Sequence, residues 1–323
     1  MYNESIKLFH IEVELWGPNM PLFQHLIVKV MPIIPKPVVR LVSNRYVAGP
    51  ELANAVKTVK VLNATGATAT MDVLGESAQT LDESREAVAE YLRVLESIVS
   101  ENLDCNISLK PTQLGLLLDK EACYHNIHTI LTDARQRNIF VRVDMEDASC
   151  TSSTIELYKR LRAEFDNVGI VIQAYLRRSP ADLDQLIPLG TNFRLCKGIY
   201  NEPRAIAWKT HKTVNDNFIH LIDKALSASC YVGIATHDEE IVCGGMHIID
   251  RLGLKKDQYE FQMLLGVDEE LRRIIINAGH TLRVYVPYGQ KWYAYSMRRL
   301  KENPKIAGYI AKAVLTGFFK RKK

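Results

Sequence analysis

Eight short runs rich in β-branched and aromatic residues alternate with stretches of helix length from Ala67 onward. The runs are "ATATMDVLG", "CNISLK", "IFVRVDMED", "GIVIQAY", "FRLCKGIY", "CYVGIATHD", "QYEFQML" and "TLRVYVPYG". The stretches between them include "ESREAVAEYLRVLESIVSE" and "ELYKRLRAEF", whose apolar residues have helical spacing. Strands that alternate with helices form a parallel sheet with crossover helices. Eight such units over roughly 250 residues predict a (β/α)8 barrel.

A doubly wound open sheet is the alternative architecture for such a chain. Folds of that kind more often carry a glycine-rich phosphate-binding turn after an early strand, yet neither G-x-G-x-x-G nor G-x-x-x-x-G-K-[ST] occurs. The first 66 residues instead contain helical segments separated by "GPNMP" and "MPIIPKP". We therefore expect an α/β protein with an N-terminal helical arm, residues 1–66, and a catalytic TIM-type barrel that ends in a C-terminal helix, residues 67–323.

Composition narrows the class of protein. The chain has 323 residues, 47% of them hydrophobic and 24% charged, which suits a globular protein with a large core. A formal net charge of +4 is too small to indicate nucleic-acid binding, and no uninterrupted apolar run is long enough to span a bilayer. The six cysteines are scattered without a C-x-x-C pair, which predicts reduced thiols in a cytoplasmic protein. His125 and His128 have the helical spacing of a metal pair, but no carboxylate ligand is evident nearby, so we predict no metal site.

One face of several predicted strands is polar. In "IFVRVDMED", for example, Val141 and Val143 alternate with Arg142 and Asp144. Barrel strands are usually apolar on both faces, because one face packs on helices and the other fills the interior. The polar residues lie mostly toward the carboxyl ends of the strands, where (β/α)8 enzymes have their active sites. The residues expected around this mouth are Lys110, Asp144, Gln173, Arg194, His237, Gln262 and Tyr285.

A predicted helix follows the last strand and carries a polar stripe. Tyr295, Arg298, Arg299 and Glu302 are spaced i, i+3, i+4 and i+7, so they share one helical face. Pro304 is expected to end this helix. Because the helix comes directly after the eighth strand, we expect its stripe to lie over the same mouth.

The charges of these residues indicate an anionic substrate. Lys110 and the two arginines of the stripe could bind it, since an arginine fork pairs bidentately with a carboxylate. Asp144 and Glu302 supply counter-charges, and nearby tyrosines offer flat apolar surfaces. A small carboxylate with an apolar body, such as an amino acid, would fit. The residues alone leave two enzyme classes open: a redox enzyme, and a Schiff-base aldolase that uses Lys110 or Lys197.

Seven motifs carry a resemblance to a known family. They are "SLK", "VDMED", "VIQAYLRRSP", "RLCKGIYNE", "ATHD", "YEFQMLLG" and "RVYVPYG" with "WYAYSMRRLKEN". In this order and spacing they resemble the proline dehydrogenase family from about Ala67 to Pro304. The resemblance implies a flavoenzyme of the monofunctional bacterial form with noncovalent FAD at the barrel mouth. It would oxidise L-proline to 1-pyrroline-5-carboxylate by hydride transfer from proline C5 to flavin N5, the first step of proline catabolism to glutamate.

The resemblance also implies roles for individual residues. Asp144 and Arg194 match the paired catalytic positions. The residues expected to bind substrate are Lys110, Tyr285, Tyr295, Arg298, Arg299 and Glu302. The residues expected to bind FAD are Met145, Gln173, Arg194, Lys197, Gly198, Ile199, Tyr200, Thr236, His237 and Gln262. The sequence departs from the family pattern at Ile199, where many members have alanine, and at Asp238, where others have asparagine.

The resemblance further implies partners for the reaction. Reduced flavin must pass its electrons on, and a membrane quinone is the implied acceptor, while the product could be handed over to a pyrroline-5-carboxylate dehydrogenase. The segment "YIAKAVLTGFFKRKK" has an apolar helical face followed by basic residues, which suits peripheral contact with the inner face of the cell membrane. Packing of this segment on the barrel is the alternative. A membrane-surface protein without enzyme activity is the remaining rival to the two enzyme classes.

Overall fold

The computed structural model describes residues 39–40, 43–293 and 295–297. The chain divides into two compact units, and the larger one, Asn44–Trp292, contains every strand of the described part. The predicted helices before residue 39 and the predicted C-terminal helix lie outside the described residues. None of the described helices is both long enough and apolar enough to cross a membrane.

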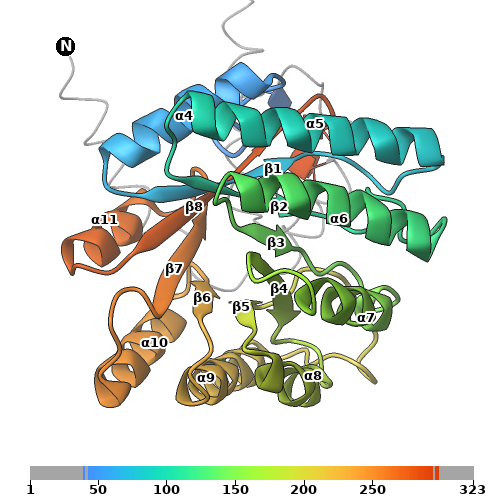
Figure 1. Ribbon diagram of the computed structural model, residues 1–323. Helices are drawn as coiled ribbons and strands as arrows, with labels where there is room; N and C mark the ends of the chain where they lie inside the picture. The colour runs from blue at the N-terminus through green and yellow to red at the C-terminus, as the bar shows by residue number, and fades with distance from the viewer. Residues whose placement is uncertain (1–38, 41–42, 294, 298–323) are drawn as a thin grey trace, which may run out of the picture. The chain divides into compact units, whose positions relative to one another are not determined.

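Eight parallel strands close into a barrel in which each strand pairs with the next and the last pairs with the first (Figure 1). The strands are β1 Thr68–Val73, β2 Cys105–Leu109, β3 Val141–Val143, β4 Val168–Gln173, β5 Asn192–Cys196, β6 Val232–Ala235, β7 Tyr259–Leu264 and β8 Leu282–Tyr288. Each of the eight β-rich runs coincides with one of these strands, although β4 and β5 each begin one residue before their run. The predicted (β/α)8 barrel is therefore confirmed.

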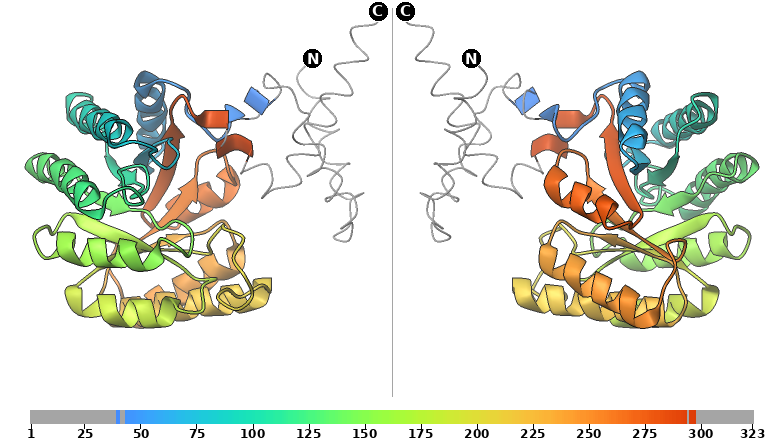
Figure 2. Two further views of the ribbon diagram at one scale, coloured as in Figure 1. Left: turned by 90° about the vertical axis from the view of Figure 1, so that its right-hand side faces the viewer. Right: turned by 90° about the vertical axis from the view of Figure 1, so that its left-hand side faces the viewer.

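Helices surround the barrel, as both views of Figure 2 show. They are α4 Leu52–Ala64, α5 Leu81–Ser100, α6 Lys120–Gln136, α7 Thr151–Arg162, α8 Ser179–Leu186, α9 His211–Ser227, α10 Glu239–Leu252 and α11 Glu269–Asn277, with a short 3-10 helix, η2 Ile187–Leu189. Side chains cap several of their N-termini and satisfy backbone N–H groups that have no partner within the helix. Thr80 caps α5 and Asp119 caps α6 in this way.

The two faces of each strand have separate environments. In β2, Ile107 and Leu109 are fully buried and belong to the same hydrophobic cluster as Leu95 of α5 and Ile127 of α6. Ser108 lies between them in sequence, and it forms hydrogen bonds inside the barrel instead. The apolar face thus secures the helices, while the opposite face carries the polar groups that build the site.

The described helix α4 falls within the predicted N-terminal arm but packs with the barrel. Its residues Ala55, Val59 and Leu62 are buried in the main hydrophobic cluster. The division of the chain at residues 66 and 67 stays a prediction, because most of the predicted arm lies outside the described residues.

Candidate functional site

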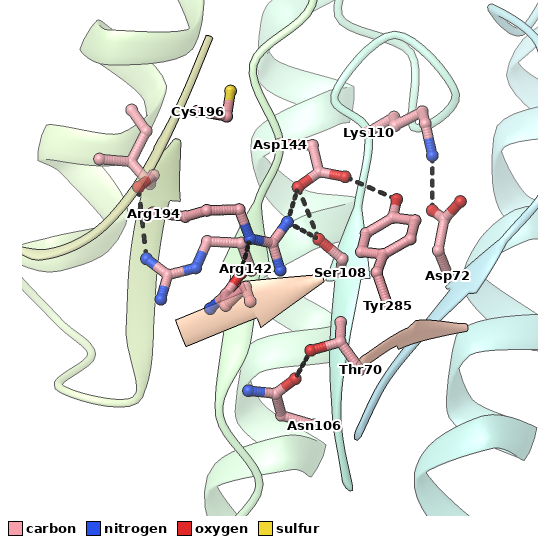
Figure 3. A network of polar contacts seen from close by, with 12 residues as sticks. Thr70, Asp72, Asn106, Ser108, Lys110, Arg142, Asp144, Arg194, Cys196 and Tyr285 are labelled. Atoms are coloured by element: carbon pink, nitrogen blue, oxygen red, sulfur yellow. Dashed lines mark hydrogen bonds and ion pairs between the residues drawn. The ribbon is translucent and has the colours of Figure 1, made fainter. Parts of the chain in front are cut away.

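An ion pair between Asp144 and Arg194 lies at the centre of the mouth (Figure 3). Asp144 directly follows β3, and Arg194 lies within β5, so two separate strands bring them together. Arg194 Nη1 is 2.7 Å from Asp144 Oδ1. Ser108 of β2 donates to the same carboxylate oxygen at 2.6 Å and accepts from Arg194 Nη1 at 3.1 Å. The exposed fractions of the two side chains are only 13% and 8%, so water screens this attraction weakly.

Tyr285 of β8 completes the surroundings of Asp144. Its hydroxyl donates to Asp144 Oδ2 at 3.0 Å, while its ring centroid lies 5.3 Å from the Arg194 guanidinium carbon. Asp144 therefore accepts hydrogen bonds from three side chains, which suits an ionised carboxylate. The structure brings together Asp144, Arg194 and Tyr285, three of the residues that the sequence placed at the mouth.

A second ion pair joins Lys110 to Asp72 of β1, at 2.5 Å between Nζ and Oδ1. Asp72 is fully buried, and burial raises the pKa of its carboxyl, with Lys110 opposing that rise. Burial would lower the pKa of Lys110, but the Asp72 and Asp144 carboxylates outweigh it and raise that pKa. Lys110 is therefore a cation whose charge is stabilised from within the barrel.

Asp72 is not among the residues that the sequence predicted for the mouth. The signal was present, because an acidic residue in the apolar run "ATATMDVLG" is stable there only with a partner. The pairing of β1 with β2 sets Asp72 beside Ser108, at the level of the central ion pair. Its other oxygen, Oδ2, is buried and has no hydrogen-bond partner in the described part of the chain.

The two predicted glutamines at the mouth have different contacts. Gln262 of β7 accepts from Arg194 Nε at 2.5 Å and donates to Glu260 at 2.6 Å. Gln173 at the end of β4 donates to the backbone oxygen of Glu146 at 2.7 Å. Glu260 was not among the residues predicted for the mouth either, although it is a charged residue in the predicted strand "QYEFQML".

Lys197, just after β5, belongs to a polar group on the side of the mouth formed by α9 and α10. Its Nζ is 2.6 Å from Asp238 Oδ2 and 3.0 Å from His211 Nε2. Asn215 donates to both Asp238 and Glu240, at 3.2 and 2.5 Å. Burial would raise the pKa of Asp238, but the hydrogen bonds from Lys197 and Asn215 lower it below its ordinary value. Asp238 thus supplies a counter-charge to Lys197.

The same group is the one place in the described part of the chain where three metal-binding side chains gather. Ligand atoms of His211, Asp238 and Glu240 lie within 4.8 Å of one another. The Lys197 ammonium already pairs with Asp238, which disfavours a cation there. His128, considered above for a metal, has a carboxylate neighbour that the sequence did not reveal, because its Nε2 lies 3.4 Å from a carboxylate oxygen of Glu164.

The remaining predicted flavin-binding residues lie on the loops around β3, β5 and β6. His237 Nε2 accepts from the backbone N–H of Leu264 at 2.8 Å, and Thr236 accepts from the backbone N–H of Asp238 at 3.1 Å. Gly198 has a φ of +98°, and a Cβ there would lie 2.1 Å from the ring of Tyr175. Of the other predicted flavin-binding residues on these loops, Met145 is buried, Ile199 is exposed and Tyr200 is half-buried.

Four predicted substrate-binding residues fall beyond the barrel unit. Tyr295 is half-buried and belongs to the smaller compact unit. Arg298, Arg299 and Glu302 lie outside the described residues, so their roles stay predictions.

Comparison with known proteins identifies the family of the chain. The profile of the family described as Proline dehydrogenase matches residues 55–312. Proline dehydrogenase 1 of Bacillus subtilis subsp. natto is 38% identical over 276 residues, which cover 85% of this chain and 91% of that protein. Proline dehydrogenase of Deinococcus radiodurans is 32% identical over 280 residues, which cover 85% and 90% of the two chains.

A solved structure shares the fold. Proline utilization A from Bdellovibrio bacteriovorus, inactivated by N-propargylglycine, superposes with a TM-score of 0.78 at 23% identity, over 87% of this chain and 36% of that one. The sequence relatives confirm both the resemblance seen in the motifs and the prediction of a proline dehydrogenase enzyme. The chain belongs to the proline dehydrogenase family.

Proposed function

We propose that the chain oxidises L-proline to 1-pyrroline-5-carboxylate with noncovalently bound FAD, as the first step of proline catabolism to glutamate. The observation that carries this proposal is the Asp144–Arg194 ion pair, fixed by Ser108, Gln262 and Tyr285 at the barrel mouth. Preorganised charges of this kind stabilise charge that develops during a reaction. The relatives named for the same activity support the choice of proline as substrate.

The residues at the carboxyl ends of β4 and β5 fit FAD by the chemistry of their donors. Arg194 and Lys197 carry positive charge there, and Gln173 supplies an amide. Cations and amides are the groups that an anionic dinucleotide with a polar ring edge requires. When bound, FAD would accept at flavin N5 the hydride that leaves proline C5. This assignment also explains why the chain has no glycine-rich dinucleotide-binding turn.

The protein side chains bind and orient the substrate in this proposal. Lys110, with Arg298 and Arg299, would hold the proline carboxylate, and Tyr285 would pack on the ring with Tyr295. Asp72 keeps Lys110 protonated, so that the cation is available to the carboxylate. Glu302 would orient the two arginines.

The contacts of Lys110 and Lys197 disfavour the aldolase alternative, because each lysine is paired with a carboxylate. A Schiff-base lysine attacks as a neutral amine, so its pKa is usually lowered. The pKa of Lys110 is instead raised by its carboxylate neighbours. Lys197 Nζ is engaged at 2.6 Å by the Asp238 carboxylate.

We extend the proposal to the partners of the reaction. A membrane quinone would take the electrons, with peripheral contact at the inner face of the cell membrane, and a pyrroline-5-carboxylate dehydrogenase would consume the reactive product. The C-terminal segment "YIAKAVLTGFFKRKK", which lies outside the described residues, is the candidate for that contact.

One experiment tests the proposed function. The purified chain, reconstituted with FAD, is mixed anaerobically with L-proline while the flavin spectrum is recorded and the product is identified by mass spectrometry. We expect bleaching of the flavin and formation of 1-pyrroline-5-carboxylate, with D-proline as the control. A protein that binds no FAD, or a flavin that stays oxidised in L-proline, would contradict the proposal. Trapping of a lysine adduct by borohydride with a ketone substrate would favour the aldolase.

A further inference from the structure

We infer that Gln262, Glu260 and Arg283 form a buried relay that positions Arg194, and that Gly233 leaves the space this relay needs. The inference deepens the proposed function and rests on the role that this function gives to Arg194. The three relay residues act through Arg194, so they are positioning residues; for Gln262 this role takes the place of the direct FAD contact that the resemblance implied.

The relay is continuous and shielded from water. Arg194 Nε donates to Gln262 Oε1 at 2.5 Å, and Gln262 Nε2 donates to Glu260 Oε1 at 2.6 Å. Arg283 Nε then donates to both oxygens of Glu260, at 2.9 and 3.0 Å. The exposed fractions of Gln262 and Glu260 are 6% and 2%. Side chains from β5, β7 and β8 are thereby joined across the barrel interior.

The hydrogen bonds of the relay can run in only one direction, because its two ends have fixed donor and acceptor roles. An arginine only donates hydrogen bonds and an ionised carboxylate only accepts them, whereas an amide does both. Gln262 must therefore turn its oxygen toward Arg194 and its nitrogen toward Glu260. Neither methionine nor a carboxylate at position 262 could satisfy both neighbours at once.

The far end of the relay is firmly anchored. Arg283 Nη1 donates to the backbone oxygen of Ala69 in β1 at 2.7 Å. Burial would raise the pKa of Glu260, but Arg283 and Gln262 lower it below its ordinary value, which keeps Glu260 an acceptor. Arg194 is consequently tied through side chains to the strand that carries Asp72.

Gly233 of β6 provides the room for Gln262. The strand pairings set Gly233 beside Arg194 on one side and beside Glu260 on the other. A Cβ at position 233 would lie 2.4 Å from Gln262 Nε2 and 2.9 Å from its Cδ, which is closer than real atoms approach. A glycine inside a strand often marks such a close approach.

Together, the relay and Asp144 hold two different nitrogens of the Arg194 guanidinium. Asp144 and Ser108 engage Nη1, and Gln262 engages Nε. The arginine plane is then fixed at two points before any ligand binds. Such preorganisation matters for a group that stabilises developing charge, since a misplacement of about 1 Å can slow a reaction by about a hundredfold.

Two variants break the relay in different ways. Gly233→Ala pushes the Gln262 amide aside without removing a polar group, and Gln262→Met removes both hydrogen bonds at similar volume. Gly244→Ala in α10 is the matched control, because its added methyl would contact Ile219 at 3.0 Å, away from the relay. Arg194→Met serves as the reference for complete loss of the positioned group.

The measurements are the FAD dissociation constant, the flavin midpoint potential, the anaerobic rate of flavin reduction by L-proline, and the melting temperature. We expect Gly233→Ala and Gln262→Met to keep FAD, to shift the potential in the same direction as Arg194→Met, and to slow flavin reduction by about tenfold to a hundredfold. Gly244→Ala should match the wild type in potential and rate.

Gln262→Glu adds a pH test that a purely structural role would not pass. Glutamate at this position can donate to Glu260 only while it is protonated. The rate of flavin reduction should therefore stay close to wild type at low pH and fall as the pH rises and this proton is lost. The wild-type profile should lack that fall.

The outcomes separate the inference from the proposed function. If Arg194→Met slows flavin reduction but both relay variants behave like Gly244→Ala, the relay inference alone is wrong. If Gln262→Met loses FAD while Gly233→Ala behaves like the control, Gln262 contacts the cofactor directly and the relay is also refuted. An unchanged rate in Arg194→Met would contradict both the relay and the proposed role of Arg194.

Discussion

Two ion pairs at the barrel mouth, Lys110–Asp72 and Arg194–Asp144, are largely shielded from water. This shielding determines how much free energy is lost when one partner is replaced. The side chain of Asp72 is fully buried, whereas that of Lys110 keeps an exposed fraction of 19%. By contrast, Lys212 and Asp216 form a pair whose side chains are 80% and 55% exposed. Exposed pairs contribute about 0–1 kcal/mol, whereas breaking a buried pair costs about 3–5 kcal/mol. The buried pairs are therefore the sensitive positions of the site.

Replacing Asp72 should change the pH dependence of substrate binding. Asp72→Asn keeps the shape of the side chain but removes a charge that raises the pKa of Lys110. Lys110 should then lose its proton at a lower pH than in the wild type. We expect the carboxylate tetrahydro-2-furoate to bind the variant well near neutral pH but to weaken earlier as the pH rises. The measurement is a titration of the flavin spectrum from about pH 7 to 10.

Asp216→Asn is the control for this titration, because it breaks an exposed pair near the N-terminal end of α9 that includes neither Lys110 nor Asp72. In this control, the binding of tetrahydro-2-furoate should weaken at the same pH as in the wild type. If Asp72→Asn also loses binding at the wild-type pH, Asp72 does not set the charge of Lys110.

Individual elements show what the sequence could predict. All eight strands were expected from hydrophobic runs, because a strand buried on both faces leaves a strong local signal. Asp144 and Arg194 were expected because they end or interrupt such runs. Asp72 and Glu260 stand out in the sequence as charges within apolar runs, but the partners that define their roles, like those of His211, lie on other strands and helices and could not be read from a local pattern.

Two glycines within strands, Gly233 and Gly169, mark places where a long polar side chain needs room inside the barrel. Gly233 makes room for Gln262, and Gly169 of β4 makes room for Arg142, whose Nη1 would lie 2.3 Å from a Cβ there. Arg142 is buried, and burial lowers its pKa to about 9. A glycine within an apolar strand therefore indicated a long polar side chain inside the barrel.

The loop that follows β5 should be sensitive to any side chain at Gly198. Gly198→Ala would strain a backbone with φ of +98° and would collide with the ring of Tyr175. Strain of this kind costs about 1–3 kcal/mol. We expect a lower melting temperature and FAD binding weakened by about tenfold, since 1.4 kcal/mol corresponds to a factor of about ten. Fluorescence titration with FAD measures the second effect.

Gly253→Ala separates the collision from the backbone strain. Gly253 also has a positive φ, +62°, but a Cβ there would meet nothing within 4 Å. This variant should lose some stability and keep FAD affinity. Equal FAD affinity in both variants would remove Gly198 from the cofactor site.

The molecule as a whole combines a described barrel with terminal segments whose roles stay predictions. The basic segment Lys320–Lys323 adds four positive charges to an apolar stretch. A basic residue near an anionic membrane contributes about 1 kcal/mol. We expect the full chain to sediment with anionic vesicles, and a chain ending at Pro304 to remain in the supernatant. Neutral vesicles and high salt are the controls, and equal sedimentation of both chains would contradict the membrane role.

The central claim is that the Asp144–Arg194 pair drives proline oxidation at the barrel mouth. Its most direct test is anaerobic stopped-flow reduction of bound flavin by saturating L-proline, in wild type and Arg194→Met matched for FAD content. Loss of a preorganised charged donor should slow reduction by about 10²–10³-fold at a temperature where both proteins are folded, and the melting temperature should fall because a buried ion pair is broken. Asp144→Asn should slow it in the same direction. Equal reduction rates in wild type and Arg194→Met would contradict the account.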